Sequence, residues 1–125
     1  MITRALHHHG HCLLDTVWHA TGWWQRARGL IGRPPLQPGQ GLWLAPCASV
    51  HTCFMPQALD LLFLDRELRV LGWRAGVPAW RAAGWRGAHG TLEMAPGSLA
   101  RIRPSAGQQL CWHPVPSPSP TEAMP

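Results

Sequence analysis

Short apolar runs, separated by glycine and proline, recur along most of this chain. The clearest run covers residues 58–64, where both alternating faces are apolar except at Asp60. Such a run predicts a central strand that is covered on both sides. Alternating apolar positions bounded by turn residues predict further strands over 12–18, 41–45, 48–55, 68–73, 91–94 and 108–112.

A single helix is expected early in the chain. Trp23, Ala27 and Leu30 form an i, i+4, i+7 apolar stripe, which predicts a short helix over 22–30 with Thr21 as its cap. Many short strands with one helix favour a mainly β, single-domain, antiparallel β-sandwich or barrel of jelly-roll type, with one short N-terminal helix. A parallel sheet would need several crossover helices, and the pattern offers only one.

The two ends of the chain differ from its middle. Residues 1–11 contain consecutive histidines without apolar periodicity, which predicts a flexible His-rich arm. Residues 12–113 form the predicted β-rich core domain, and its length is sufficient for a real hydrophobic core. Residues 114–125 alternate Pro and Ser and are predicted to be disordered. Residues 76–90 lack a pattern and are expected to form a long loop.

The formal charge of +5 arises from arginine alone, because the chain has no lysine. We interpret this bias, together with the absence of tyrosine, as the mark of a GC-rich bacterial genome. The arginines are spread along the sequence, which argues against a nucleic-acid-binding face. No apolar run is long enough for a membrane span, and the N-terminus lacks the apolar segment of a signal peptide. We therefore expect a cytoplasmic protein whose cysteines are free thiols or ligands.

Soft metal-ligand side chains gather in the predicted strand 48–55 and just before it. If this segment is extended, one face presents a row of Cys47, Ser49, His51, Cys53 and Met55. Thiolate, imidazole and thioether groups suit copper or zinc, so Cys47, His51 and Cys53 are candidate metal ligands, with Met55 in support. The alternative is that Cys53 and Met55 fill the core, while His51 and Thr52 fix a loop by hydrogen bonds.

Other residues suggest different chemistry. Asp60 in its apolar strand must be hydrogen-bonded or paired, either structurally or as a general base beside His51. Cys47 or Cys53 with His51 could form a nucleophile–base pair, although no third orienting residue is visible. The tryptophans of the 80–85 loop could contact another protein, or they could pack in the core.

Five groups of residues resemble one known family in their order and spacing. These are residues 26–33; 39–42; 46–47 with His51, Thr52 and Met55; 59–60 with 63–65; and 92–93 with 96–97. The chain resembles the domain of unknown function 192 family. The resemblance implies a compact jelly-roll sandwich, and no catalytic activity is established for the family as a class. Some members look associated with pilus or secretion gene clusters. The chain departs from the family pattern at Pro56-Gln57 and at Gly107-Gln108.

Together these patterns predict a non-enzymatic binding or accessory module that could serve an envelope, pilus or secretion assembly. The predicted ligand-binding residues are His51, Thr52, Met55, Asp60, Arg28, Arg33 and Trp80. One alternative is a small-molecule enzyme that uses His51 and Asp60. Another is a protein that binds copper or zinc through Cys47, His51, Cys53 and Met55.

Overall fold

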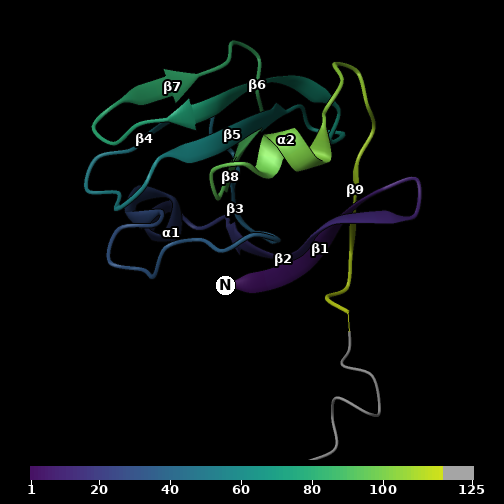
Figure 1. The fold of residues 1–125 in the computed structure, drawn as a ribbon, viewed down its shortest axis with the longest axis horizontal. Helices are drawn as coiled ribbons and strands as arrows, with labels where there is room; N and C mark the ends of the chain where they lie inside the picture. The colour runs from purple at the N-terminus through teal and green to yellow at the C-terminus, as the bar shows by residue number, and fades with distance from the viewer. Residues whose placement is uncertain (117–125) are drawn as a thin grey trace, which may run out of the picture.

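The computed structural model describes residues 1–116. Its elements, in chain order, are β1 (Ile2–His8), β2 (His11–Ala20), α1 (Trp23–Arg28), β3 (Gln40–Leu44), β4 (Ser49–His51), β5 (Leu59–Leu64), β6 (Val70–Val77), β7 (Ala82–Gly84), β8 (Gly90–Met94), α2 (Ser98–Ile102) and β9 (Cys111–His113). They form a seven-stranded sheet in the order β6-β5-β8-β3-β2-β1-β9 and a two-stranded sheet, β4-β7 (Figure 1). No helix within residues 1–116 is long and apolar enough to cross a membrane.

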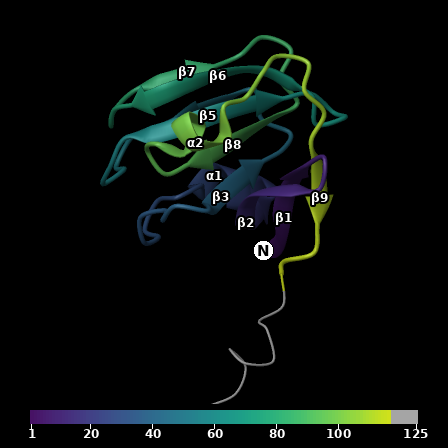
Figure 2. The same ribbon diagram turned by 45° about the vertical axis from the view of Figure 1, so that its right-hand side comes forward.

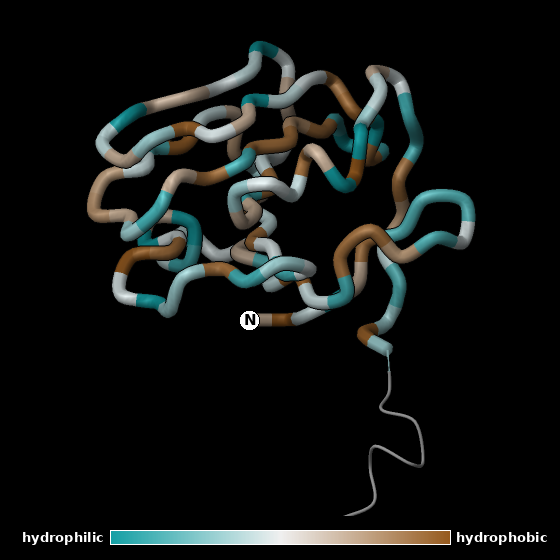
Figure 3. The backbone as a smooth tube through the Cα atoms, viewed as in Figure 1, coloured by the Kyte–Doolittle hydropathy of each residue, from teal (hydrophilic) through white to brown (hydrophobic). Residues whose placement is uncertain are grey.

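The predicted central strand is confirmed as β5. All of its residues are buried, and it pairs antiparallel with β6 on one side and with β8 on the other. The strand has a helix or a loop segment over each face, so apolar side chains at every position but one are stabilised by burial. Figure 3 shows the contrast between the apolar interior strands and the hydrophilic turn that joins β1 to β2.

The mainly β architecture is confirmed, whereas the predicted jelly-roll sandwich is not confirmed. The large sheet is mixed and curved, as Figure 2 shows, and the described residues do not close it into a barrel. Its two edges are linked near one end, where the Val70 N–H donates to the Gln108 carbonyl at 2.9 Å. One apolar cluster with α2 fills the inner face, and a second lies on the outer face beneath α1 and β4-β7.

Strand β1 replaces the predicted flexible arm. It lies inside the sheet between β2 and β9, and its Ala5 and Leu6 are fully buried. Because its buried apolar residues are only these two consecutive ones, the segment has no alternating pattern that the sequence could reveal. The partner β9 is more than a hundred residues away, so the pairing that stabilises β1 is entirely tertiary. Of the predicted Pro/Ser tail, residues 117–125 lie outside the described residues.

One strand pair departs from the predicted antiparallel arrangement. Strands β2 and β3 are parallel, with Val17 opposite Gly41, and the chain crosses between them through α1 and residues 29–39. A single short helix together with an extended segment is therefore enough for one crossover. Helix α1 lies on the outer face and α2 on the inner face (Figure 1).

Helix α1 is shorter than predicted and does not bury its tryptophans. Trp23 and Trp24 are 73% and 68% exposed, and no residue of the helix is buried. Gln25 rather than Thr21 caps the first turn, because its Oε1 accepts the backbone N–H groups of Thr21 and Gly22. Of the predicted stripe, only Leu30, beyond the helix end, reaches the core.

Asp60 fixes the inner face of the sheet. Its side chain is 2% exposed; Oδ1 accepts the Gly76 N–H at 2.8 Å and Oδ2 accepts the Leu99 N–H at 2.9 Å. One carboxylate thus joins β6 to the first turn of α2. This arrangement corresponds to the structural alternative for Asp60, in which the buried carboxylate is hydrogen-bonded, here to two backbone N–H groups.

Replacing Asp60 by Asn should destabilise the fold by about 2–4 kcal/mol, because one buried N–H then faces an amide N–H₂. Urea unfolding of both proteins measures the difference. Asp65→Asn is the matched control, since Asp65 Oδ1 also accepts two backbone N–H groups but in an exposed turn. An effect at Asp60 no larger than that at Asp65 would contradict the structural role.

Candidate functional site

The predicted row of soft ligands is interrupted in the structure. Strand β4 ends at His51, and the chain then turns, with Phe54 in a left-handed conformation at φ 63°. Alternation of faces holds only along a regular strand, so Cys53 does not continue the row. Cys53 instead donates its backbone N–H to His51 Nδ1 at 3.3 Å.

Thr52, a predicted ligand-binding residue, makes hydrogen bonds to the backbone of another segment and does not line a cavity among the described residues. It is 1% exposed, and its hydroxyl donates to the Pro78 carbonyl at 2.6 Å and accepts the Arg81 N–H at 2.9 Å. Its backbone N–H donates to the Arg81 carbonyl, and its carbonyl accepts the Trp80 N–H. Thr52 therefore ties the turn after β4 to the segment before β7.

A cavity of about 140 Å³, named here the Glu93 pocket, lies on the outer face between α1, β4 and β8. Its polar and sulfur-bearing walls come from Arg26, Arg28, Cys47, Ser49, His51, Met55 and Glu93. The structure thus brings together four residues singled out from the sequence: Arg28, Cys47, His51 and Met55. They come from three separate segments, and β8 adds Glu93 from a fourth.

Glu93 is the chemically unusual member of this pocket. Its side chain is 4% exposed, and burial raises its pKa to about 8. Burial, which removes water from the charged form of the carboxyl, is the cause of this shift. At neutral pH the carboxyl is therefore mainly protonated and can donate a hydrogen bond.

The other polar groups of the pocket also act mainly as donors. His51 Nδ1 accepts the Cys53 N–H, so a neutral His51 carries its proton on Nε2. Burial raises the pKa of Cys47, and its thiol donates to the Ser49 carbonyl at 2.9 Å. A thiol in this state is a weak nucleophile. The guanidinium groups of Arg26 and Arg28 add positive charge.

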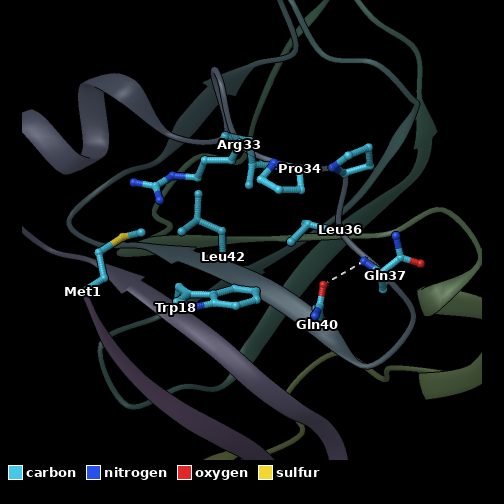
Figure 4. A pocket seen from close by; sticks show the side chains of 10 residues that line it. Met1, Trp18, Arg33, Pro34, Leu36, Gln37, Gln40 and Leu42 are labelled. Carbon is cyan, nitrogen blue, oxygen red and sulfur yellow. Dashed lines mark hydrogen bonds between the residues drawn. The ribbon is translucent and has the colours of Figure 1, made fainter.

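A second and larger cavity, named here the apolar pocket, adjoins the same segment of chain. It measures about 420 Å³ and is lined by Met1, Trp18, Leu30, Arg33, Pro34, Pro35, Leu36, Gln37, Gln40 and Leu42. Figure 4 shows Arg33 and Pro34 on one side of the space and Trp18 and Leu42 on the other. The predicted site residue Arg33 belongs to this pocket, where burial and the neighbouring Arg28 lower its pKa.

The candidate metal ligands do not converge. Within residues 1–116, no group of three or more His, Cys, Asp or Glu side chains is placed to hold one ion. Cys47 and His51 line the Glu93 pocket, whereas Cys53 does not. The early end of β4 is the physical reason, since it turns Cys53 away from the other two.

Asp60 and His51 lie on opposite faces of the large sheet. Asp60 is paired with Met94, and the next position, Leu61, is paired with Glu93. Directly opposite residues of antiparallel strands share a face, and successive residues alternate, so Asp60 faces α2 and Glu93 faces the pocket. The predicted acid–base pair of His51 and Asp60 is therefore not assembled in this structure.

The 80–85 segment is more ordered than the predicted loop. It contains β7, which pairs with β4, and its two tryptophans differ. Trp80 is 58% exposed and packs edge-on against Phe54, with ring centroids 4.6 Å apart. Trp85 instead stacks on Phe63, and the Arg74 guanidinium lies 4.6 Å from its ring centroid.

Sequence reasoning did not single out Glu93 or Arg26 as site residues. Glu93 is the one acidic side chain in the apolar run 90–94, and this is the same signal that drew attention to Asp60. Arg26 is one of three arginines between residues 16 and 59, a stretch that contains no acidic residue. Both signals are present in the sequence, but only the fold places Glu93 and Arg26 in the same pocket as His51.

A family model matches residues 5–112, which is most of the chain, and it is that of DUF192, described as "Uncharacterized ACR". The chain belongs to the DUF192 family. Among curated proteins, none matches its sequence.

Two solved structures share the fold of this DUF192 protein. One is a protein of unknown function from Novosphingobium aromaticivorans, with TM-score 0.75 and 19% sequence identity. The match covers 89% of the present chain and 84% of the Novosphingobium chain. The other is a putative transcription regulator from Sinorhizobium meliloti, with TM-score 0.75 and 21% sequence identity. The match covers 88% of the present chain and 92% of the Sinorhizobium chain.

The raised pKa of Glu93 predicts a specific pH dependence of stability. The folded state holds this proton up to about pH 8, whereas the unfolded state releases it near 4.5. The raised pKa of Glu93 therefore adds fully to the stability of the fold below pH 4.5, and this stabilisation is lost as the pH rises through 8. Relative to Glu93→Gln, the free energy of unfolding of the wild type should fall from pH 5 to 8.5 by up to about 1.4 kcal/mol per pH unit.

Urea unfolding at intervals across this range measures the effect. Both proteins retain His19, whose pKa burial lowers to about 4, so its contribution cancels in the comparison. Parallel stability curves for the two proteins would show that Glu93 titrates near its ordinary value.

Proposed function

We propose that this DUF192 protein is a binding module that holds a small anionic ligand in the Glu93 pocket, and that it is not an enzyme. The mostly buried carboxyl of Glu93 at the wall of a cavity supports this most directly. Burial removes water from this carboxyl and so raises its pKa, and hydrogen bonding that is lost with water costs free energy. A ligand that accepts the Glu93 proton in a hydrogen bond removes this cost on binding.

The polarity of the pocket supports an acceptor-rich ligand. Protonated Glu93 and His51 Nε2 present donors, and so do the N–H groups of Arg26 and Arg28 that are not bonded to the Thr21 and Ile31 carbonyls. A carboxylate accepts several such bonds at once and is favoured by the positive charges. A cationic ligand would meet Arg26 and Arg28 instead.

The size of the pocket limits what can bind. A non-hydrogen atom takes about as much room as a liquid water molecule, about 30 Å³. A cavity of about 140 Å³ therefore accommodates a short carboxylate, or the polar end of a longer molecule. The lining residues Leu44, Val50 and Met55 suit the first carbons of such a chain.

Binding without chemistry fits an accessory role. The family resemblance adds the proposal that ligand binding serves an envelope, pilus or secretion assembly from the cytoplasmic side. A partner protein would contact the exposed aromatic pair of Phe54 and Trp80, which projects from the end of β4-β7. Aromatic side chains of this kind are enriched at protein interfaces.

Sodium propanoate, titrated at pH 7 into protein labelled with ¹³C at the methionine methyl groups, should shift the Met55 resonance with millimolar affinity. Met94 should stay in place, because it is fully buried on the inner face. Glu93→Leu should weaken binding by about tenfold or more, since the donor is lost. Arg28→Gln should weaken it severalfold, while Arg101→Gln, on the exposed side of α2, should have no effect.

The pH dependence adds an independent measurement. As Glu93 ionises above pH 8, wild-type affinity should fall, because the carboxylates repel; Cys47, His51, Arg26 and Arg28 are the other titratable or charged groups facing it. Glu93→Gln retains a donor and should lose this dependence. If propanoate leaves Met55 unmoved at all pH values, the proposal is wrong.

A further inference from the structure

The segment of residues 29–36, named here the strap, connects the two cavities. Leu30 lines both the Glu93 pocket and the apolar pocket. A third space of only about 10 Å³ lies between them and is lined by Leu30, Arg33, Leu36, Met55 and Leu59, among others. The strap therefore crosses the outer face with unfilled space on both sides of Leu30.

We propose that the natural ligand is a medium-chain alkyl carboxylate, with its carboxylate in the Glu93 pocket and its alkyl chain passing beneath Leu30 into the apolar pocket. This inference rests on the proposed function, because it uses the same pocket for the carboxylate. It adds the chemical class of the ligand and a second cavity that the ligand occupies.

The apolar pocket has the composition and size for an alkyl chain. Its walls include Trp18, Leu30, Leu36 and Leu42, and it offers few polar groups. A cavity of about 420 Å³ holds roughly a dozen carbon atoms, if each takes about 30 Å³. Figure 4 shows the side chains of Leu36 and Leu42 pointing into the same space.

The hydrogen bonds of the strap connect it mainly to itself and to the end of α1, and not to the large sheet. Its hydrogen bonds are mostly local: Arg33 Nε donates to the Gly29 carbonyl at 3.0 Å, and Arg28 Nε donates to the Ile31 carbonyl at 3.0 Å. Gln57 Nε2, which donates to the Leu36 carbonyl at 3.1 Å, ties it to the segment before β5. Because Leu30 lies outside the strands of the sheet, the proposed passage of the alkyl chain requires its side chain to move but leaves strand pairing intact.

The opposite orientation of the ligand is less favourable. In that case Arg33 would bind the carboxylate, and the chain would remain in the apolar pocket alone. Arg33 Nε donates to the Gly29 carbonyl just as Arg28 Nε donates to the Ile31 carbonyl, so these bonds do not separate the two orientations. The difference is that the opposite orientation leaves the Glu93 pocket empty and its donors without the carboxylate. The two orientations place the carboxylate beside different methionines, Met55 or Met1.

A chain-length series tests the inference on the wild-type protein. Acetate, propanoate, hexanoate, octanoate and decanoate are titrated below their micelle concentrations into the methionine-labelled protein. We expect propanoate to shift Met55 alone, and octanoate and decanoate to shift both Met55 and Met1. Affinity should rise about threefold to fourfold for each added methylene until the apolar pocket is full.

Two controls sharpen the result. Octanol carries the same chain without the carboxylate and should bind far more weakly at Met55 than octanoate does. Leu36→Phe fills part of the apolar pocket and should reduce the gain per methylene without changing propanoate affinity. Its thermal unfolding is measured alongside; the wild-type series decides the question if this variant does not fold.

The failures of the two proposals are distinguishable. If propanoate binds at Met55 but affinity stays constant with chain length, the Glu93 pocket stands and the alkyl-chain inference is overturned. If long carboxylates shift Met1 alone, the chain enters the apolar pocket from Arg33, and the inference is likewise overturned. If no carboxylate shifts Met55, both proposals fail.

Discussion

The register between β5 and β8 is the constraint on which the arrangement of this protein depends. Asp60 pairs with Met94, and Leu61 pairs with Glu93. This offset of one residue places the two buried carboxyls on opposite faces of a single sheet. Asp60 meets two backbone N–H groups and holds α2 to β6, whereas Glu93 meets a cavity. A shift of one position would place Asp60 and Glu93 on the same face of the sheet.

The two faces differ in how completely they are packed. The inner cluster gathers residues from β1, β2, β5, β8 and α2 around side chains that are almost entirely buried. The outer face is covered by a short helix with no buried residue, by the strap and by β4-β7. Cavities occur along this cover because a few leucines, and not a continuous layer, fill the space. These cavities make the outer face the candidate place for a ligand.

Two tryptophan rings pack directly against glycine residues, which leaves no room for a larger residue at those glycine positions. A Cβ at Gly90 would lie 2.3 Å from the Trp43 ring, and one at Gly72 would lie 2.4 Å from the Trp85 ring. Each indole therefore packs on the bare backbone of a neighbouring strand. This pairing explains why Trp85 is drawn into the outer cluster, while Trp80, in the same segment, remains exposed beside Phe54.

Much of the fold follows from local pattern, and the exceptions share one cause. The strands around 41–45, 58–64 and 91–94 are apolar enough to be predicted, and the buried Asp60 required partners wherever it lay. Strand β1 has two inward apolar residues and a distant partner, so no local pattern marks it. The row from Cys47 to Met55 looked regular, but the contacts of Thr52 with Pro78 and Arg81 turn the chain after His51.

The sequence by itself determined the family, the mainly β class and the central strand, and it predicted the neighbourhood of His51 as the candidate place for a site. Those features depend on residue types and on spacing within a short segment. Only the tertiary structure decided that Asp60 is structural, that Cys53 leaves the site and that Glu93 enters it. These outcomes depend on which strands lie side by side and in which register, and strand pairing over long separations is set by the packing of the whole sheet.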